Sequence, residues 1–219
     1  MEYAIFFIAA VVGLLIPALN PAILLSRAVY GKDIRELGSK NPGFTNFKRC
    51  FGPKLAWLVM VLDLLKSALP CFVFGILFER ILSDRALGVA FTCLFSVIGH
   101  SYPVWYGFKG GKGFLVSLAG MWIMHPLAGL AATLVMSVLL LTTKYMSLSS
   151  LSGLMAGLTV IFFVTEGEFL PNLLFILSVF LVVLRHRGNI ARLLTKKEIK
   201  FYIFGNKNKD GHLDTDEKT

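Results

Sequence analysis

Seven apolar, charge-poor runs dominate the sequence and limit what the chain can fold into. A run of about 20 apolar residues is long enough to cross the hydrocarbon core of a bilayer as a helix. The pattern predicts an all-α integral membrane protein with seven transmembrane helices. The runs cover about residues 4–25, 55–78, 87–106, 114–124, 126–141, 147–165 and 169–184.

The composition agrees with a membrane protein. Of the 219 residues, 56% are hydrophobic and only 16% are charged, whereas about a quarter of the residues of a soluble domain are charged. The first run follows Glu2 rather than Lys or Arg and is longer than the apolar core of a signal peptide, so we expect a retained span. The three cysteines lack the paired spacing of a disulfide framework or a zinc site.

The fourth and fifth runs are short and are separated by His125 and Pro126. Because proline interrupts a helix, we expect a short helical hairpin here. A single long helix kinked at Pro126 is the alternative.

The lysines and arginines indicate the orientation of the chain. With seven spans, one side carries 19 of the 22 basic residues, in the segments 27–54, 109–112, 144 and from 185 onward. Basic loops stay in the cytoplasm, so the N-terminus is predicted outside and the C-terminus cytoplasmic. A six-span count would put Lys144 and the basic tail on the other side. The net charge of +9 is therefore explained by topology and by contact with anionic lipid, and it does not indicate binding to nucleic acid.

The first of three polar islands on the basic side is "GSKNPGFTNFKR", residues 38–49. Its glycines permit tight turns, and successive backbone N–H groups in such a turn can bind an anion. Lys48 or Arg49 would add positive charge. An ordinary polar loop is the alternative.

The second island is "GHSYPVWYGFKGGKG", residues 99–113. Its end, Lys109 to Gly113, leads into the fourth run, so amides and lysines meet at a helix N-terminus, where phosphate is favoured. It is not a P-loop, because Tyr106 stands where the first glycine of that motif belongs and Gly113 replaces Ser or Thr. An interfacial loop with snorkelling lysines is the alternative.

The third island, residues 185–192, directly follows the last run and holds three arginines and a histidine. Arginines form strong charge-assisted hydrogen bonds with phosphate, although such clusters also anchor lipid headgroups. Within the second run, Asp63 and Lys66 are spaced to pair on one helix face. Charges inside a membrane are costly, so we expect both to face the interior of the bundle.

The three islands, in this order and on one membrane face, resemble the motifs of the bacterial acyl-phosphate:glycerol-3-phosphate acyltransferases, the PlsY family. The third of them reads "HRGNIARL" from His186. The stretches "DLLK" from Asp63 and "TKYMSL" from Thr143 are weaker matches. The similarity extends from about Tyr3 to Leu194.

The resemblance implies a seven-span enzyme of the bacterial inner membrane with its active site on the cytoplasmic face. Such an enzyme transfers a fatty acyl group from acyl phosphate to the sn-1 hydroxyl of glycerol 3-phosphate, giving lysophosphatidic acid and phosphate. It implies no cofactor, no metal and no nucleic acid; the partners are the two substrates and the bilayer. In agreement, no histidine of the chain is followed by Asp five positions later, so the H-x-x-x-x-D motif of CoA-dependent acyltransferases is absent.

The resemblance also assigns roles to residues. Ser39, His100 and Asn189 would lie closest to the reacting carbon, with His100 or a substrate phosphate oxygen as the base. Glycerol 3-phosphate would be bound by Arg49, Lys112, Ser147, His186 and Asn189. The acyl phosphate would be bound by Ser39, Asn41, Gly43, Thr45, Asn46, Lys109, Gly110, Gly111 and Lys112.

The chain departs from the family pattern in the first island. Lys40, Pro42 and Phe44 stand where the family usually has glycine, isoleucine and alanine, and Asn20 precedes Pro21 where Ser or Ile is common. These departures bear on the shape of the loop and on acyl-chain preference.

A membrane transporter of phosphorylated anions is the alternative function, since it also needs cations inside a helix bundle. Transporters tend to have repeated halves with helices broken at mid-membrane, and the sequence shows no internal repeat. We expect one domain over residues 1–194 and a disordered polar tail over 195–219. Residues 206–217 of the tail nearly match a calcium-binding EF-hand loop, but the chain ends without the exiting helix.

Overall fold

The computed structural model describes residues 2–203, and within them all regular secondary structure is helical. This confirms the all-helical prediction. Two short 3₁₀ turns cover Ile34–Glu36 and Val104–Tyr106. The α-helices are α1 (Glu2–Ala18), α2 (Pro21–Tyr30), α3 (Phe44–Phe51), α4 (Pro53–Leu82), α5 (Arg85–Ser101), α6 (Phe114–Met124), α7 (Pro126–Thr143), α8 (Met146–Val164), α9 (Phe169–Arg185) and α10 (Arg187–Leu194).

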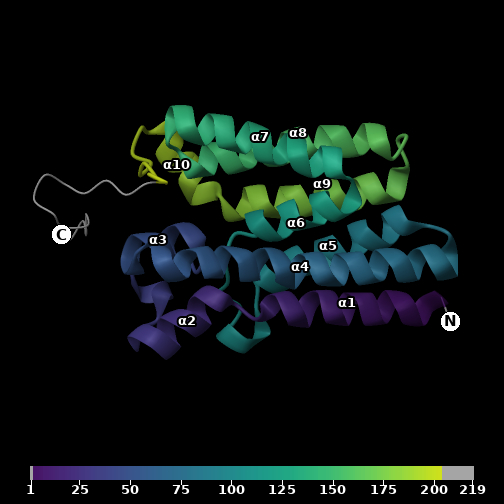
Figure 1. Ribbon diagram of the computed structural model, residues 1–219, viewed down its shortest axis with the longest axis horizontal. Helices are drawn as coiled ribbons and strands as arrows, with labels where there is room; N and C mark the ends of the chain where they lie inside the picture. The colour runs from purple at the N-terminus through teal and green to yellow at the C-terminus, as the bar shows by residue number, and fades with distance from the viewer. Residues whose placement is uncertain (1, 204–219) are drawn as a thin grey trace, which may run out of the picture.

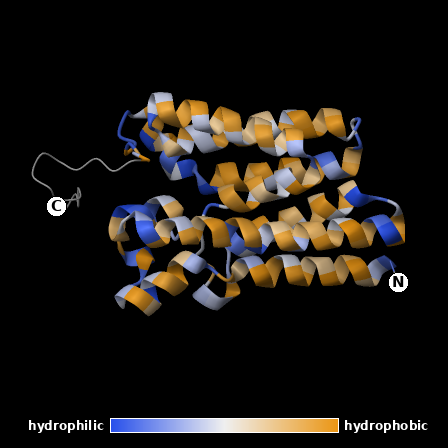
Figure 2. Ribbon diagram, viewed as in Figure 1, coloured by the Kyte–Doolittle hydropathy of each residue, from blue (hydrophilic) through white to orange (hydrophobic). Residues whose placement is uncertain are grey.

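The long helices α1, α4, α5, α7, α8 and α9 run along the longest axis of the molecule (Figure 1). The N-terminus lies at one end of this axis, and α2, α3 and α10 lie at the other. Figure 2 shows hydrophobic residues along the middle of the bundle and hydrophilic ones gathered near its two ends. Within residues 2–203, five helical segments are long and apolar enough to cross a membrane. The bent pair α9 and α10, at 59° to each other, makes a sixth, and α6 is a shorter apolar helix.

The first apolar run, expected as one span over 4–25, forms one candidate span, Glu2–Tyr30, which is broken between α1 and α2. Asn20 caps α2 by accepting a hydrogen bond from the N–H of Ile23 at 3.0 Å. Pro21 follows as the first helical residue, where its missing N–H costs nothing. Lys66 on α4 donates to the carbonyl of Leu19 at 3.1 Å. The side chain of Lys66 thus satisfies a carbonyl group at the break between the two helices.

The fourth and fifth runs form the predicted hairpin, and the single kinked helix is excluded. Trp122 on α6 donates through its indole N–H to the Thr133 hydroxyl on α7 at 3.1 Å. Eleven residues would span about 16 Å along one continuous helix, so the two helices fold back on each other. His125, between them, caps α7 by accepting from the N–H of Leu127.

Small residues let the helices approach closely. Gly99 on α5 lies against the main chain of α1 at Leu14, and Gly153 on α8 lies against the carbonyl of Ala132 on α7. No side chain would fit at Gly99, because its β-carbon would overlap the Leu14 carbonyl. Such contacts are typical of helix pairs that associate in a membrane, where packing rather than burial from water drives association.

Residues 195–203, which the sequence analysis assigned to a polar tail, pack back against the end of the bundle that carries α3. The N–H of Phe201 donates to the carbonyl of Lys144 at 2.7 Å. Lys48 on α3 donates to the carbonyls of Tyr202 and Ile203. The EF-hand-like stretch 206–217 lies outside the described residues.

Candidate active site

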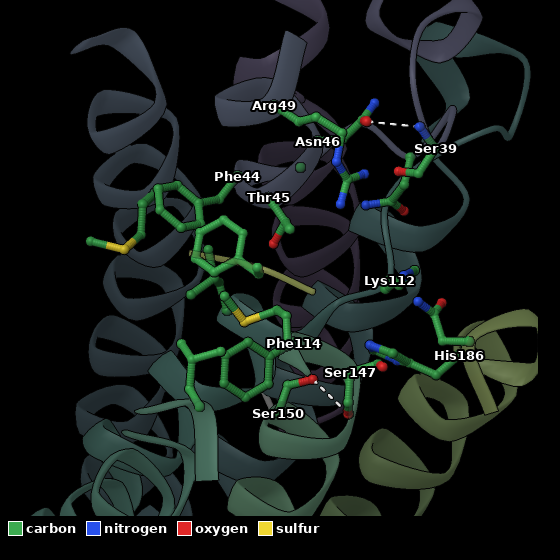
Figure 3. A pocket seen from close by; sticks show the side chains of 18 of the residues that line it. Ser39, Phe44, Thr45, Asn46, Arg49, Lys112, Phe114, Ser147, Ser150 and His186 are labelled. Carbon is green, nitrogen blue, oxygen red and sulfur yellow. Dashed lines mark hydrogen bonds between the residues drawn. The ribbon is translucent and has the colours of Figure 1, made fainter. Parts of the chain in front are cut away.

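A cavity of about 240 Å³ opens at the end of the bundle where α2, α3 and α10 lie (Figure 3). It lies between segments far apart in the sequence. All the predicted site residues line it except Lys109, Gly110 and Gly111. The predicted site residues that line the cavity are Ser39, Asn41, Gly43, Thr45, Asn46, Arg49, His100, Lys112, Ser147, His186 and Asn189.

The N-termini of α3, α6, α8 and α10 all lie at this cavity, since residues of their first turns or caps line it. The unpaired N–H groups at a helix N-terminus carry partial positive charge. Lys112, Arg49 and Arg192 add full charges among the lining residues. The cavity is therefore built to attract anions, and phosphate in particular.

The first polar island wraps around the side chain of Asn46. Its amide oxygen accepts from the N–H of Ser39 at 2.8 Å, and its NH₂ donates to the carbonyl of Leu37 at 2.9 Å. Gly38 has a positive φ of 53°, and a β-carbon there would meet the Asn46 oxygen. Asn46 is fully buried, so it shapes the loop that presents Ser39 to the cavity.

Asn20, one of the departures from the family pattern, helps to hold this loop. Asn20 is fully buried and donates from its side-chain amide to the carbonyl of Pro42 at 3.1 Å. The same side chain caps α2 through its oxygen. The Asn20 side chain thus holds the first island, through the main-chain carbonyl of residue 42, against the break between α1 and α2.

The second island is held by an arginine that the sequence analysis did not assign to the site. Arg185, at the end of α9, donates to the carbonyls of Gly110 at 2.9 Å and Gly111 at 3.2 Å. A β-carbon on Gly111 would overlap the imidazole of His100, so only glycine fits there. Lys109 is exposed. The two glycines therefore pack against His100 and Arg185 rather than lining the cavity.

His100 borders the cavity beside the ion pair predicted within the second apolar run. Lys66 Nζ lies 2.8 Å from Asp63 Oδ1, and both side chains are buried. His100 Nδ1 lies 3.7 Å from the same oxygen and has no hydrogen-bond partner within residues 2–203. The His100 side chain is 5% exposed. A buried imidazole at the wall of an anion-binding cavity is suited to accept or donate a proton.

His186 and Lys112 lie on the same side of the cavity in Figure 3. His186 Nδ1 lies 2.8 Å from the carbonyl of Val182. Because a carbonyl can only accept, Nδ1 carries the proton, and Nε2 of the neutral imidazole is a hydrogen-bond acceptor. Burial lowers the pKa of Lys112 to about 8, although Glu198 acts in the opposite direction. Lys112 is thus a cation whose charge depends on pH in the range just above neutrality.

Glu198 brings a carboxylate into this cluster. It accepts hydrogen bonds from Ser147 at 2.7 Å and Asn189 at 2.6 Å, both on Oε1, and from Arg192 at 2.8 Å on Oε2. Burial by itself would raise the pKa of Glu198, but these three hydrogen bonds outweigh it and hold the pKa below its usual value. The carboxylate is therefore ionised at neutral pH.

The other half of the cavity is apolar. In Figure 3 Phe44 and Phe114 lie on the side away from Lys112 and His186. The apolar lining comes mainly from α4, α6 and α7, with further residues from α3, α8 and the segment after α10, and consists of Phe44, Trp57, Met60, Phe114, Leu115, Met136, Leu140, Met146, Ile199, Phe201 and Ile203. A ligand with an anionic head and a hydrocarbon chain matches both halves.

Sequence reasoning missed some of the residues around the cavity. Asp63 carried a signal, because a charged residue inside a membrane span marks a functional site by default. Arg185 and Arg192 belong to the third island but were not distinguished from lipid anchors. Glu198 had no signal, because a single acidic residue in a basic tail has no motif around it. Within residues 2–203, no three His, Cys, Asp or Glu side chains are grouped as a metal ion would need.

Comparisons with known proteins bear on this cavity. The sequence model of the family described as "Glycerol-3-phosphate acyltransferase" matches residues 7–196. A protein of that name from Finegoldia magna is 34% identical over 200 residues, covering 91% of this chain and 98% of the relative. Another from Aquifex aeolicus is 38% identical over 177 residues, covering 78% and 86%.

Two solved structures also resemble the chain. Both are crystal structures of PlsY (YgiH), an integral membrane glycerol 3-phosphate acyltransferase. The glycerol 3-phosphate form has a TM-score of 0.80 at 32% identity and covers 90% of this chain and 96% of the other. The lysophosphatidic acid form has a TM-score of 0.77 at 30% identity, with coverages of 90% and 95%.

Proposed function

The chain belongs to the glycerol-3-phosphate acyltransferase family, and we propose that it uses acyl phosphate as the donor at the cytoplasmic face of the bacterial inner membrane. It is an integral membrane acyltransferase with glycerol 3-phosphate as the acceptor. The product on this account is lysophosphatidic acid, and inorganic phosphate is released. No cofactor enters the proposed reaction.

The observation that carries the proposal is that one cavity combines an anion-binding half with an apolar half. Helix N-termini and the cations Arg49, Lys112 and Arg192 form the first, and side chains of α4, α6 and α7 form the second. Acyl phosphate has both characters in one molecule. We assign its phosphoryl group to the first island and the nearby N-terminus of α3, and its hydrocarbon chain to the apolar half.

Glycerol 3-phosphate would occupy the opposite wall of the polar half. There Ser147 and Asn189 point their donors at one place, and Arg49, Lys112 and His186 line the same cavity. Holding two anions together against their repulsion requires this density of positive charge. Fixing both reactants in one orientation can lower a barrier by about 7–11 kcal/mol.

In the proposed reaction the hydroxyl oxygen attacks the carbonyl carbon of the acyl phosphate. The bond from that carbon to the phosphate oxygen breaks, and phosphate leaves with the electron pair. Because the donor is already an activated anhydride, no covalent enzyme intermediate is needed. His100, beside the cavity, or a phosphate oxygen of the substrate receives the hydroxyl proton.

We propose seven membrane crossings, with α6 completing the count. Its 11 residues extend about 16 Å, roughly half of a 30 Å hydrocarbon core. Support comes from its two ends: α6 begins at the cavity, and Arg85, at the start of α5, donates to the carbonyls of Ile123 and Met124 at its other end. We further propose one catalytic domain over residues 1–194, to which the segment 195–203 adds part of the cavity lining. Because basic residues surround the cavity, we place it at the cytoplasmic face.

The orientation is testable by cysteine labelling in intact cells. In a Cys50→Ser background, Glu166→Cys and Thr195→Cys are exposed on the two opposite sides of the proposed topology. A membrane-impermeant maleimide should label Glu166→Cys from outside and label Thr195→Cys only after lysis. Labelling of Thr195→Cys in intact cells would contradict the orientation.

The donor is tested with purified protein in lipid nanodiscs and radiolabelled glycerol 3-phosphate. We expect labelled lysophosphatidic acid with palmitoyl phosphate and none above background with palmitoyl-CoA. Product formed equally well from palmitoyl-CoA would overturn the donor assignment while leaving the acyltransferase activity in place.

A further inference from the structure

Residues 196–203, here called the C-terminal strap, lie against the cavity, with Glu198 in its polar half and Phe201 beside Phe44 of its apolar half. Glu198, Ile199, Phe201 and Ile203 are among the residues that line it. The strap lies almost entirely beyond residues 7–196, the part of the chain that the family model matches.

The strap is anchored at several points independent of Glu198. The N–H of Phe201 donates to the Lys144 carbonyl at 2.7 Å, and the Phe201 ring packs edge-on against Phe44, 5.8 Å between centroids. Lys48 donates to the carbonyls of Tyr202 and Ile203. These contacts fix the strap on α3 and on the loop before α8, so that Glu198 reaches into the cavity.

The Glu198 carboxylate takes up hydrogen-bond donors that the proposed function assigns to the substrate phosphate. Its side chain is only 7% exposed and is bound by Ser147, Asn189 and Arg192. The Ser147 hydroxyl has a single proton to donate. It cannot donate to Glu198 and to a phosphate oxygen at the same time, so binding of glycerol 3-phosphate through Ser147 requires Glu198 to leave.

We propose that Glu198 is an intramolecular competitor of the substrate phosphate, carried into the glycerol 3-phosphate site by the C-terminal strap. This inference rests on the proposed function. A phosphate monoester carries a charge of about −1.5 to −2 at pH 7, against −1 for a carboxylate. Phosphate displaces Glu198 from the cations where a monoanion of the same size does not, so the strap sharpens selection for phosphate-bearing acceptors and lowers their apparent affinity.

The test is Glu198→Gln in the full-length protein, assayed in nanodiscs with saturating palmitoyl phosphate. The substitution keeps the shape of the side chain and removes its charge and its ion pair with Arg192. We expect the KM for glycerol 3-phosphate to fall about tenfold, with kcat within twofold of the wild type. Glu36→Gln is the matched control, because Glu36 is an exposed glutamate outside the cavity and its loss changes the net charge equally. Its KM should not move.

Lys48→Met is a second variant that leaves Glu198 intact. It removes the two hydrogen bonds that hold Tyr202 and Ile203, and Lys48 does not line the cavity. Loosening the strap should also lower the KM for glycerol 3-phosphate, by a smaller factor of roughly three. A fall in KM without a fall in kcat separates competition from a general loss of structure, which would reduce kcat.

Calorimetric titration of glycerol 3-phosphate, without any donor, separates this inference from the proposed function. Tighter binding to Glu198→Gln than to the wild type supports competition. If the wild-type protein is active, unchanged binding to Glu198→Gln would overturn the competition. Weaker binding would also overturn it and would make Glu198 a ligand of the substrate instead. A wild-type protein that binds glycerol 3-phosphate but makes no lysophosphatidic acid would refute the proposed function alone.

Discussion

The two halves of the cavity are formed by different kinds of chain segment. The polar half is made of loops and helix N-termini that come together from distant parts of the chain, at residues 39–49, 112, 147 and 186–198. The apolar half is made mostly of side chains on regular helices, such as Met60 on α4 and Met136 on α7. A phosphate is bound by backbone N–H groups that point at one place, and helix N-termini and turns provide such groups. A hydrocarbon chain needs only a smooth apolar wall.

This difference predicts how the two halves respond to substitution. In the polar half each charge and donor has a fixed place, so single substitutions should have large effects on transfer. In the apolar half the contacts are many and individually weak, so substitutions should change which acyl chain is preferred. The predictions below test that contrast.

The largest effect is expected at Lys112. We expect Lys112→Ala to lower kcat/KM for glycerol 3-phosphate roughly 10²–10³-fold, because it removes a charge that stabilises the anionic substrates and the developing negative charge. Steady-state assays in nanodiscs measure this. Lys109→Ala is the matched control: Lys109 belongs to the same loop but is exposed and outside the cavity. If both variants lost activity equally, the loop as a whole rather than the cavity would be responsible.

His100→Gln tests the proton acceptor where the two halves meet. We expect kcat to fall about 100-fold, the lower range for loss of a positioned general base. His125→Gln is the control, since His125 caps α7 and lies outside the cavity. Near-normal kcat for His100→Gln in correctly inserted protein would assign the proton to a substrate phosphate oxygen.

The KM for glycerol 3-phosphate should depend on pH through Lys112. Its pKa of about 8 means that the charged form is present below pH 8 and is lost as the pH rises through that value. From pH 7 to pH 9 the charged fraction of Lys112 falls about tenfold, while the substrate phosphate, whose second pKa is about 6, is already mostly ionised at pH 7. We expect KM to rise by up to that factor. In Lys112→Arg the rise should disappear, because arginine keeps its charge; a rise that persists would come from another group.

The smallest effect is expected in the apolar half. Leu140 lines the cavity and is 5% exposed, whereas its neighbour Leu141 is 64% exposed and faces outward. We expect Leu140→Trp to shorten the preferred acyl chain, changing the ratio of kcat/KM between dodecanoyl and palmitoyl phosphate about fivefold. Each methylene excluded from the pocket costs about 0.8 kcal/mol. Leu141→Trp should leave this ratio unchanged, and a shift in both variants would place the acyl chain elsewhere.

The helices were largely predictable from the sequence because lipid imposes a strong pattern. The run 114–124 matches α6, and Pro126 marks the start of α7. The division of the first run at Asn20 was not predicted, since its cause is tertiary: Lys66 on α4 binds the carbonyl freed by the break. A hydrophobic run does not reveal where a distant lysine will donate.

The lining of the cavity was predictable where a motif held polar residues close together in the sequence. The contributions of Asn46 and Gly111 to the shape of the site were not, because they depend on which atom lies next to which. Asn46 bonds to the main chain of its own loop, and Gly111 makes room for His100. Glu198 acts through the path of the chain after α10, and no local pattern of residues encodes that path.

An experimental structure of this protein with glycerol 3-phosphate bound tests the central claim most directly. The account predicts the substrate phosphate in the polar half of the cavity, with its oxygens about 3 Å from Ser147 Oγ, Asn189 Nδ2 and Lys112 Nζ. The glycerol hydroxyl should point toward His100 and the apolar half. A phosphate bound outside the cavity, with Ser147 and Asn189 still donating to Glu198, would contradict the account.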